Sequence, residues 1–499
     1  MEPVIQITSC RRYPALPFHP PRRFPELGFL PSSLDPTNGV YAAVRELLRA
    51  AGYDRDRFDG PDWSPFSDLV RRGGRVVLKP NFVRHYHERG GDLETVVTHL
   101  SVLRPLIDYA LLAVGPEGSV VVADAPQYDC EVEELLAKNG LPDLLAWYRD
   151  VVGARVEWRD LRVEFGRQIH GVQIEKRRLP GDPEGYVEVD LGAASEFAAM
   201  GERELRLLRG ADYDEAITIL HHSGGRNAYL VSRTVLEADL VVNVPKVKTH
   251  KKSGVTLSMK NLIGINGDKN WLPHYRAGFA NRGGDEFPRP DLYARVRRLG
   301  ADVARELLKR GRAGPLLRRL RALENATGLG DRLRNGNWWG NDTIWRTAVD
   351  LNKILYLGDR QGVLGRPARR VLNVYDGIVA GEGDGPMAPD PRPVGLLAAG
   401  EDGVATDVVV AWLMGFDWRR IPILARALGV LAGDVRLTEF TGDPERLVVR
   451  WLDDGGVRDV PFAAIDTDLR FAAHPGWRGR IERARDHRPT HEGADAASA

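Results

Sequence analysis

Short hydrophobic runs that end in polar turns alternate along the chain with stretches that have apolar residues at helical spacing. The runs RVVLKPNFV, residues 75–83, and GSVVVADAPQ, residues 118–127, are typical of buried strands. Helical spacing precedes the first run at NGVYAAVRELLRAAGYD and separates the two runs at LSVLRPLIDYALLAVG. This order of helix, strand, helix and strand predicts a parallel α/β sheet.

The same alternation returns later, in LEADLVVNVPKVKTH, RRVLNVYDGIVA and PVGLLAAGEDGVATDVVVAWLMG. Residues 150–215 instead alternate apolar and charged positions, which predicts an antiparallel excursion. Residues 291–325 carry ten basic and four acidic residues and predict a pair of surface helices, either a solvated face or a basic lid over an anionic ligand. The predicted fold is therefore α/β, a mostly parallel sheet with helices on both faces, an antiparallel excursion and a helical insertion.

These patterns divide the chain into parts of one domain. Residues 1–70 are expected to form an irregular, proline-rich arm and a helix packed on the core. Residues 71–290 form the first α/β part, residues 291–345 the helical insertion, and residues 346–480 a second α/β part that completes the same domain. Residues 481–499 are expected to be a disordered tail.

Composition narrows the class of protein. With 43% hydrophobic and 28% charged residues, the chain has the composition of an ordinary soluble protein. Its net charge of +1 is too small to attract nucleic acid or an anionic membrane to the protein as a whole. Its two cysteines, Cys10 and Cys130, lie far apart and predict neither disulfides nor an Fe–S cluster. The N-terminus lacks the pattern of a signal peptide, and no run approaches the length of a membrane span. We expect a cytoplasmic protein.

One segment concentrates the lysines. Residues 243–270, NVPKVKTHKKSGVTLSMKNLIGINGDKN, contain six of the eleven lysines of a chain with 59 arginines. A surface cation can be either residue, so the remaining lysines are expected where Arg fails, because Lys can lose its proton or form a Schiff base. Three interpretations stay open: phosphate or carboxylate binding, a chemical role for one lysine, or a mutable surface loop. Residues 256–262 also predict a short helix, and Ser253, Gly254 and Thr256 at its start would present backbone N–H groups to an anion.

Polar residues at four predicted strand ends form the candidate site. Ligands of open α/β sheets bind beyond the carboxyl ends of the strands, so these groups converge if the strands are parallel neighbours. The candidate catalytic residues are His250, Lys248 and Asp376. The candidate substrate-binding residues are Lys79, Asn81, Lys246, Thr249, Lys260, Asn261, Asn270 and His274.

Three carboxylates are candidate metal ligands: Asp124, Glu382 and Asp407. Oxygen ligands favour Mg²⁺ or Mn²⁺ over zinc. The three have no local ligand spacing, and carboxylates at strand ends are also commonly helix caps or ion-pair partners. His250 is open to three interpretations: a metal ligand, an acid/base group, or a polar residue that is hydrogen-bonded in the interior.

Several segments together resemble a known family. VVLKPNFV, VVVADAPQ, ADLVVNVPKVKTHKKSGVTLSMKNLIG, DGIVAGEGDGP and LLAAGEDGVATDVVVAWLMG are similar, in this order, to the domain-of-unknown-function 362 family. GDKNWLPHYRAG, GGDEFP and GNDTIWRTAVDLNKILY resemble a long-insert subgroup of it. The resemblance covers roughly residues 70–415. Many relatives carry an appended ferredoxin-like Cys cluster that this chain lacks, so the resemblance supports the fold and the place of the site but assigns no reaction.

Two classes of function remain. The first is an enzyme that acts on a small phosphate- or carboxylate-bearing molecule at the lysine-rich crevice, with Mg²⁺ as a candidate companion. The second is a non-catalytic accessory or redox-associated module that docks a partner protein or a cofactor, with Trp338 and Trp339 as candidate anchors. An enzyme needs its lysines and carboxylates in one pocket, whereas a docking module spreads basic groups over an open face. Nucleic-acid binding is a distant third.

Overall fold

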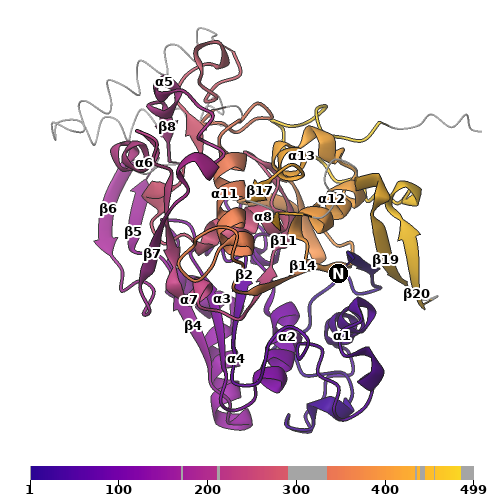
Figure 1. Cartoon of the computed structure of the whole chain (residues 1–499). Coiled ribbons are helices and arrows are strands. Elements are labelled where there is room, and N and C mark those ends of the chain that lie inside the picture. The colour runs from indigo at the N-terminus through magenta and orange to yellow at the C-terminus, as the bar shows by residue number, and fades with distance from the viewer. Residues whose placement is uncertain are drawn as a thin grey trace, which may run out of the picture.

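A twelve-stranded sheet organises the molecule (Figure 1). The computed structural model describes residues 2–169, 172–210, 214–289, 334–432, 435–438, 444–453 and 456–484. Nine of the strands run in the order β20-β19-β1-β16-β14-β10-β2-β3-β4, and β11, β12 and β15 pair outside this path. The strands of the sheet are β1 (Val4–Ile7), β2 (Arg75–Pro80), β3 (Ser119–Asp124), β4 (Val156–Asp160), β10 (Leu240–Val244), β11 (Lys246–His250), β12 (Gly254–Val255), β14 (Arg370–Asp384), β15 (Ala388–Arg392), β16 (Leu396–Gly400), β19 (Val448–Asp453) and β20 (Gly456–Pro461).

The sheet is parallel in its middle and antiparallel toward one side. Strands β14, β10, β2, β3 and β4 are parallel neighbours. Strand β16 runs antiparallel between β14 and β1. Because β10 lies between β2 and β14, strands from both predicted α/β parts share one sheet. The predicted α/β class is confirmed, whereas the division into parts stays a prediction.

Helices cover both faces of this sheet (Figure 1). Val77 belongs to one hydrophobic cluster and its neighbours Val76 and Leu78 to the other, as alternation along a strand requires. The first cluster includes side chains of α8 (Leu257–Asn261), α11 (Ile344–Leu357), α12 (Gly403–Leu413) and α13 (Pro422–Ala427). The second includes side chains of α1 (Gly39–Ala51), α2 (Leu100–Val114), α3 (Val132–Asn139) and α4 (Leu141–Trp147). No helix of the described residues is long and apolar enough to cross a membrane.

The antiparallel excursion predicted over residues 150–215 is present in part, because β4 within this range pairs parallel with β3 in the main sheet. Strand β5 (Glu164–Ile169) pairs antiparallel with β6 (Val172–Arg178), and β7 (Tyr186–Asp190) with β9 (Ala228–Ser232). The remaining described strands and α-helices, apart from short 3₁₀ and π turns, are α5 (Glu202–Leu205), β8 (Leu208–Arg209), α6 (Glu215–His221), α7 (Arg233–Leu236), β13 (Tyr275–Arg276), β17 (Leu431–Ala432) and β18 (Val435–Arg436). Residues 290–333, which include most of the helical insertion predicted over 291–345, lie outside the described residues. So do residues 485–499, most of the tail predicted over 481–499.

The N-terminal arm differs from the expectation of a purely irregular segment. Its residues Val4–Ile7 form β1, which lies between β16 and β19 and hydrogen-bonds to both. Val4 and Ile5 are fully buried. A four-residue strand leaves almost no periodicity to read, and its partners lie some 390 or more residues further along the chain. The arm therefore contributes to the sheet as well as covering it.

Candidate functional site

A cavity of about 720 Å³ lies at the carboxyl ends of β2 and β3. The residues that follow both strands line it, together with the turn after β11, the helix α8 and the segment that follows α8. This is the edge at which open parallel sheets bind ligands. Among the described residues, six lysines and two arginines line the cavity: Lys79, Lys248, Lys251, Lys252, Lys260, Lys269, Arg84 and Arg334. Three carboxylates do so as well: Glu88, Asp124 and Asp129.

The wall formed by β2 and β3 is tied together by a buried ion pair. Lys79 Nζ lies 2.8 Å from Asp124 Oδ1 and also donates to Pro80 O, at 3.0 Å. Asp124 Oδ2 accepts from the backbone N–H of Phe82, at 2.8 Å. A Cβ atom at position 264 would collide with both Asp124 and Lys79, so only glycine lets the chain pass here. Asp124, a predicted metal ligand, is therefore held by a lysine.

Two asparagines extend this wall. Asn81 Nδ2 donates to Asn261 Oδ1 at 2.9 Å, and Asn261 Nδ2 donates to Asn243 Oδ1 at 2.8 Å. Lys79 Nζ also reaches Asn261 Oδ1, at 3.3 Å. The predicted residues Asn81 and Asn261 thus lie together at the cavity and connect β2 and β10 to α8.

Two further lysines are anchored by backbone carbonyl groups instead of carboxylates. Lys248 Nζ donates to the carbonyl oxygens of Val96 and Pro386, and its side chain is fully buried. Lys269 Nζ donates to Ala125 O at 2.7 Å. Burial lowers the pKa of Lys269 to about 7 and holds the pKa of Lys248 well below its ordinary value, with Lys246 and Lys260 adding to the effect on Lys248.

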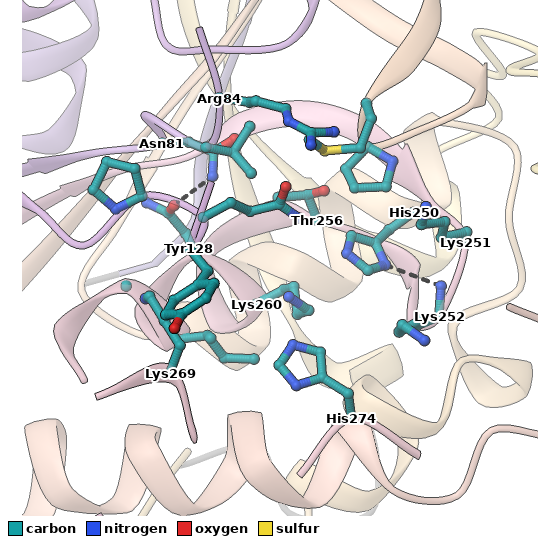
Figure 2. Close-up of a pocket in the computed structure, with 18 of the residues that line it drawn as sticks. Asn81, Arg84, Tyr128, His250, Lys251, Lys252, Thr256, Lys260, Lys269 and His274 are labelled. Carbon is teal, nitrogen blue, oxygen red and sulfur yellow. Dashed lines mark hydrogen bonds between the residues drawn. The ribbon is translucent and has the colours of Figure 1, made fainter. Parts of the chain in front are cut away.

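Two histidines, His250 and His274, line the cavity (Figure 2). Their neutral rings carry the proton on different nitrogens. His250 Nδ1 accepts the backbone N–H groups of Lys252, at 3.0 Å, and Ser253, at 3.3 Å, so its neutral ring carries the proton on Nε2. His274 Nδ1 lies 2.8 Å from Leu272 O, which only accepts, so its neutral ring carries the proton on Nδ1. Burial and the nearby lysines hold the pKa of both rings well below the ordinary value, so both are neutral at pH 7.

The structure does not bring Lys246 and Asp376 to this cavity. They form a fully buried ion pair, with Lys246 Nζ 3.0 Å from Asp376 Oδ2, and Tyr13 OH donates to Asp376 Oδ1 at 2.6 Å. Asp376 also accepts the backbone N–H of His99, at 2.9 Å. The pairing of β11 with β14 shifts register between Lys246 and Lys248, and only Lys248 lines the cavity. The N-terminal arm, through Tyr13, therefore covers the pair.

Two other predicted binding residues have structural contacts instead. Thr249 is buried and its Oγ1 donates to Gly383 O at 3.0 Å. Asn270 donates to Glu164 Oε1 at 2.5 Å and to Asp268 Oδ1 at 2.8 Å, and accepts the N–H of Asp214. Neither lines the cavity.

The predicted metal ligands are dispersed. Glu382 accepts the backbone N–H of Ala472, at 2.8 Å. Asp407 accepts the N–H groups of Ser258, at 2.8 Å, and Met259, at 3.0 Å, so the N-terminus of α8 binds this carboxylate and not an external anion. In the described part of the chain, no group of three or more His, Cys, Asp or Glu side chains could hold a metal ion.

Other lining residues were not singled out from the sequence. Lys251, Lys252 and Lys269 belong to the lysine-rich segment, so the scarcity of lysine elsewhere in this arginine-rich chain also points to them. Arg84 and Tyr128 lie four residues after the ends of β2 and β3, and each comes directly after one of the hydrophobic runs that predict these strands. Residues 334–337 carry no local signal, because they reach the cavity from a distant part of the chain.

Comparison with known proteins supports the resemblance described above. Residues 191–412 match the family model described as "Domain of unknown function (DUF362)". The chain is also similar to the thylakoid-associated protein sll1697 of Synechocystis, with 27% identity over 256 residues, or 49% of this chain and 56% of the relative. The chain thus spans about half the length of this curated relative, and the predicted long-insert subgroup stays a prediction. Residues 191–412, which contain the lysine-rich segment, therefore match the domain-of-unknown-function 362 family, as the resemblance implies.

Proposed function

We propose that the cavity binds a small anionic molecule bearing phosphate or carboxylate groups, and that the protein is an enzyme acting on it. One observation carries the proposal: the eight cationic side chains that line the cavity outnumber its three carboxylates, all of which are already paired. Asp124 pairs with Lys79, whereas Glu88 and Asp129 both pair with Arg84. A divalent cation would therefore have to arrive with the anion.

Uncompensated cations, of which Lys248 and Lys269 are buried and Lys260 is half-buried, favour such a ligand. Within the described residues, Lys248, Lys260 and Lys269 have no carboxylate within 4.0 Å, although each lines the cavity. Burying an unpaired charge is costly, and the lowered pKa values of these lysines express that cost. A bound anion supplies the missing charge, so the cavity is complementary to one.

The concave shape supports the enzyme over the docking module. The lysines and the two neutral imidazoles, which carry their protons on different ring nitrogens, line one concave space and are not spread over a flat face, as an enzyme requires (Figure 2). Trp338, one of the candidate docking anchors, is buried and its Nε1 donates to Asp285 O at 2.8 Å, whereas Trp339 is 46% exposed. Of the two candidate anchors, only Trp339 is exposed.

A thermal-shift screen with pyrophosphate, citrate and related anions tests the proposal. A ligand at about 100 times its Kd is expected to stabilise the fold by about 2.7 kcal/mol, and the shift is expected to shrink with added salt. Lys269→Met should abolish the shift, because it removes a cation from the cavity wall. Lys138→Gln, a matched control at a half-exposed lysine outside the cavity, should leave it unchanged. Absence of any shift, or equal loss in both variants, would support the docking alternative.

Anion binding is expected to take up protons near pH 8. Burial lowers the pKa of Lys269 to about 7, and burial with Lys79 nearby lowers that of Lys260 to about 8, so both lysines are partly neutral in the free protein. A bound anion favours the charged forms and raises both pKa values, so affinity should fall as pH rises from 7 to 9. Calorimetric titration with pyrophosphate in two buffers of different ionisation enthalpy should give an uptake of about one proton. Proton release would contradict this expectation.

The same lysines set a pH dependence of the free fold. A lowered lysine pKa means that the unfolded chain binds more protons than the folded one between the two pKa values. These two groups therefore destabilise the ligand-free protein below about pH 7, and the penalty fades as pH rises toward 10.

The expected cytoplasmic location and the lack of nucleic-acid and membrane partners stay part of the proposal, supported by the net charge of +1.

A further inference from the structure

Lys260 stands apart from the anchored lysines of the cavity. Lys79 is paired with Asp124, and Lys248 and Lys269 donate to backbone carbonyl oxygens. Lys260, by contrast, has neither a hydrogen-bond acceptor for Nζ nor a carboxylate within 4.0 Å among the described residues. It is half-buried, and Figure 2 shows its side chain directed into the space between the rings of His250 and His274.

The backbone beneath Lys260 is held firmly. Asp407 binds the first N–H groups of α8, and Asn352 Nδ2 donates to Met259 O at 2.9 Å. Asn261 is bonded into the asparagine network at the other end of the helix. The amine therefore extends from a rigid element, and the side chain itself has no anchor.

We propose that Lys260 is a nucleophile that forms a Schiff base with an anionic carbonyl compound, either a keto acid or a phosphorylated aldehyde or ketone. This inference rests on the proposed function, because the neighbouring cations would bind the acid group of that compound. A lysine that served only to bind an anion would gain from a fixed position such as those of Lys248 and Lys269, whose Nζ atoms are hydrogen-bonded. An amine that no other group holds, and whose side chain points into the cavity, suits attack on a carbonyl carbon instead.

The surroundings favour a neutral amine. Burial and the nearby charge of Lys79 lower the pKa of Lys260 to about 8. Desolvation and an adjacent cation are the two means by which proteins activate lysine nucleophiles. At pH 8 the unprotonated fraction is on the order of 100-fold larger than for an ordinary lysine.

The neighbouring groups fit the chemistry of the step. The Nζ lone pair forms the bond to the carbonyl carbon, and the π electrons move to oxygen, which takes the proton released by nitrogen and gives a carbinolamine. The hydroxyl group then takes a proton from solvent and leaves as water, while the nitrogen lone pair forms the C=N bond. His250, whose Nε2 carries the proton, is a donor for the carbonyl oxygen.

Reductive trapping tests the inference on the full chain. The protein is incubated at pH 8 with pyruvate, 2-oxoglutarate or glyceraldehyde 3-phosphate and sodium cyanoborohydride, and adducts are located by peptide mass spectrometry. With at least one compound, labelling of Lys260 is expected to exceed that of Lys251, a cavity lysine that also has no bonded Nζ in the described part, by about 10-fold or more. Pyrophosphate should suppress the labelling.

Two arginine variants make the result decisive. Lys260→Arg keeps the charge and should lose the adduct, while its melting temperature without ligand stays close to that of the wild type. Lys138→Arg, at a lysine outside the cavity, should keep both the adduct at Lys260 and the thermal shift with pyrophosphate. A pyrophosphate shift without preferential labelling of Lys260 would overturn the Schiff-base inference and leave the proposed function standing. Absence of both signals would overturn the two together.

Discussion

Replacing Asp376 with alanine is expected to lower the free energy of unfolding by about 3–5 kcal/mol, because it leaves the charge of Lys246 buried without a partner. Both side chains of the pair are 0% exposed. The substitution also removes the acceptor of Tyr13 OH and of the backbone N–H of His99. Urea unfolding followed by tryptophan fluorescence measures the loss.

A double variant separates the ion pair from the other contacts. Lys246→Met combined with Asp376→Asn removes both charges, and it should recover part of the stability that Asp376→Ala loses. Because neither residue lines the cavity, the folded fraction of the double variant should still be stabilised by pyrophosphate. A loss below about 1 kcal/mol in Asp376→Ala, or a double variant less stable than the single one, would show that the pair is not the source of the effect.

The periodicity of the sequence predicts the centre of the fold well. β2, β3, β10 and β16 are hydrophobic runs with polar ends, and a helix at regular spacing follows or precedes each of the first two. β1 was missed because four residues in an arm rich in proline and aromatic residues show no period, and its position depends on partners near the other end of the chain. Local patterns predict the elements, and distant pairing decides which edge each one joins.

The sequence predicts only some of the residues that line the cavity, again because local patterns do not show distant contacts. Strand ends identify Lys79, Asn81 and Asp124, and the excess of lysine identifies Lys248 and Lys260, all of which line the cavity. Their roles stay predictions. The sequence does not say which polar side chain another element already binds. Tyr13 and Asp376 lie 363 residues apart, and no local pattern marks their contact with Lys246.

The second large effect is expected at Asp407, which positions α8. Replacing it with alanine leaves the N–H groups of Ser258 and Met259 and the hydroxyl of Tyr375 without the carboxylate they donate to, the last at 2.5 Å. Each unsatisfied buried group costs about 1–3 kcal/mol, so with three such groups the free energy of unfolding should fall by roughly 3 kcal/mol or more. The folded fraction should also lose the thermal shift with pyrophosphate, because α8 carries Lys260 and Asn261.

Asp402→Ala provides the matched control, since Asp402 caps the neighbouring helix α12 by accepting the N–H of Ala405 at 2.9 Å. Loss of this cap and of the hydrogen bond from Thr438 Oγ1, at 2.5 Å, should cost about 1–2 kcal/mol and leave the pyrophosphate shift in place. A helix cap and a metal ligand are distinguished by Asp407→Asn, which retains one acceptor oxygen but no charge. If Asp407 acts as a cap, this amide variant should keep much of the stability and the shift without added metal. If instead Mg²⁺ stabilised the wild type and not Asp407→Asn, the carboxylate would be a metal ligand, and the bound ion would fix the position of α8.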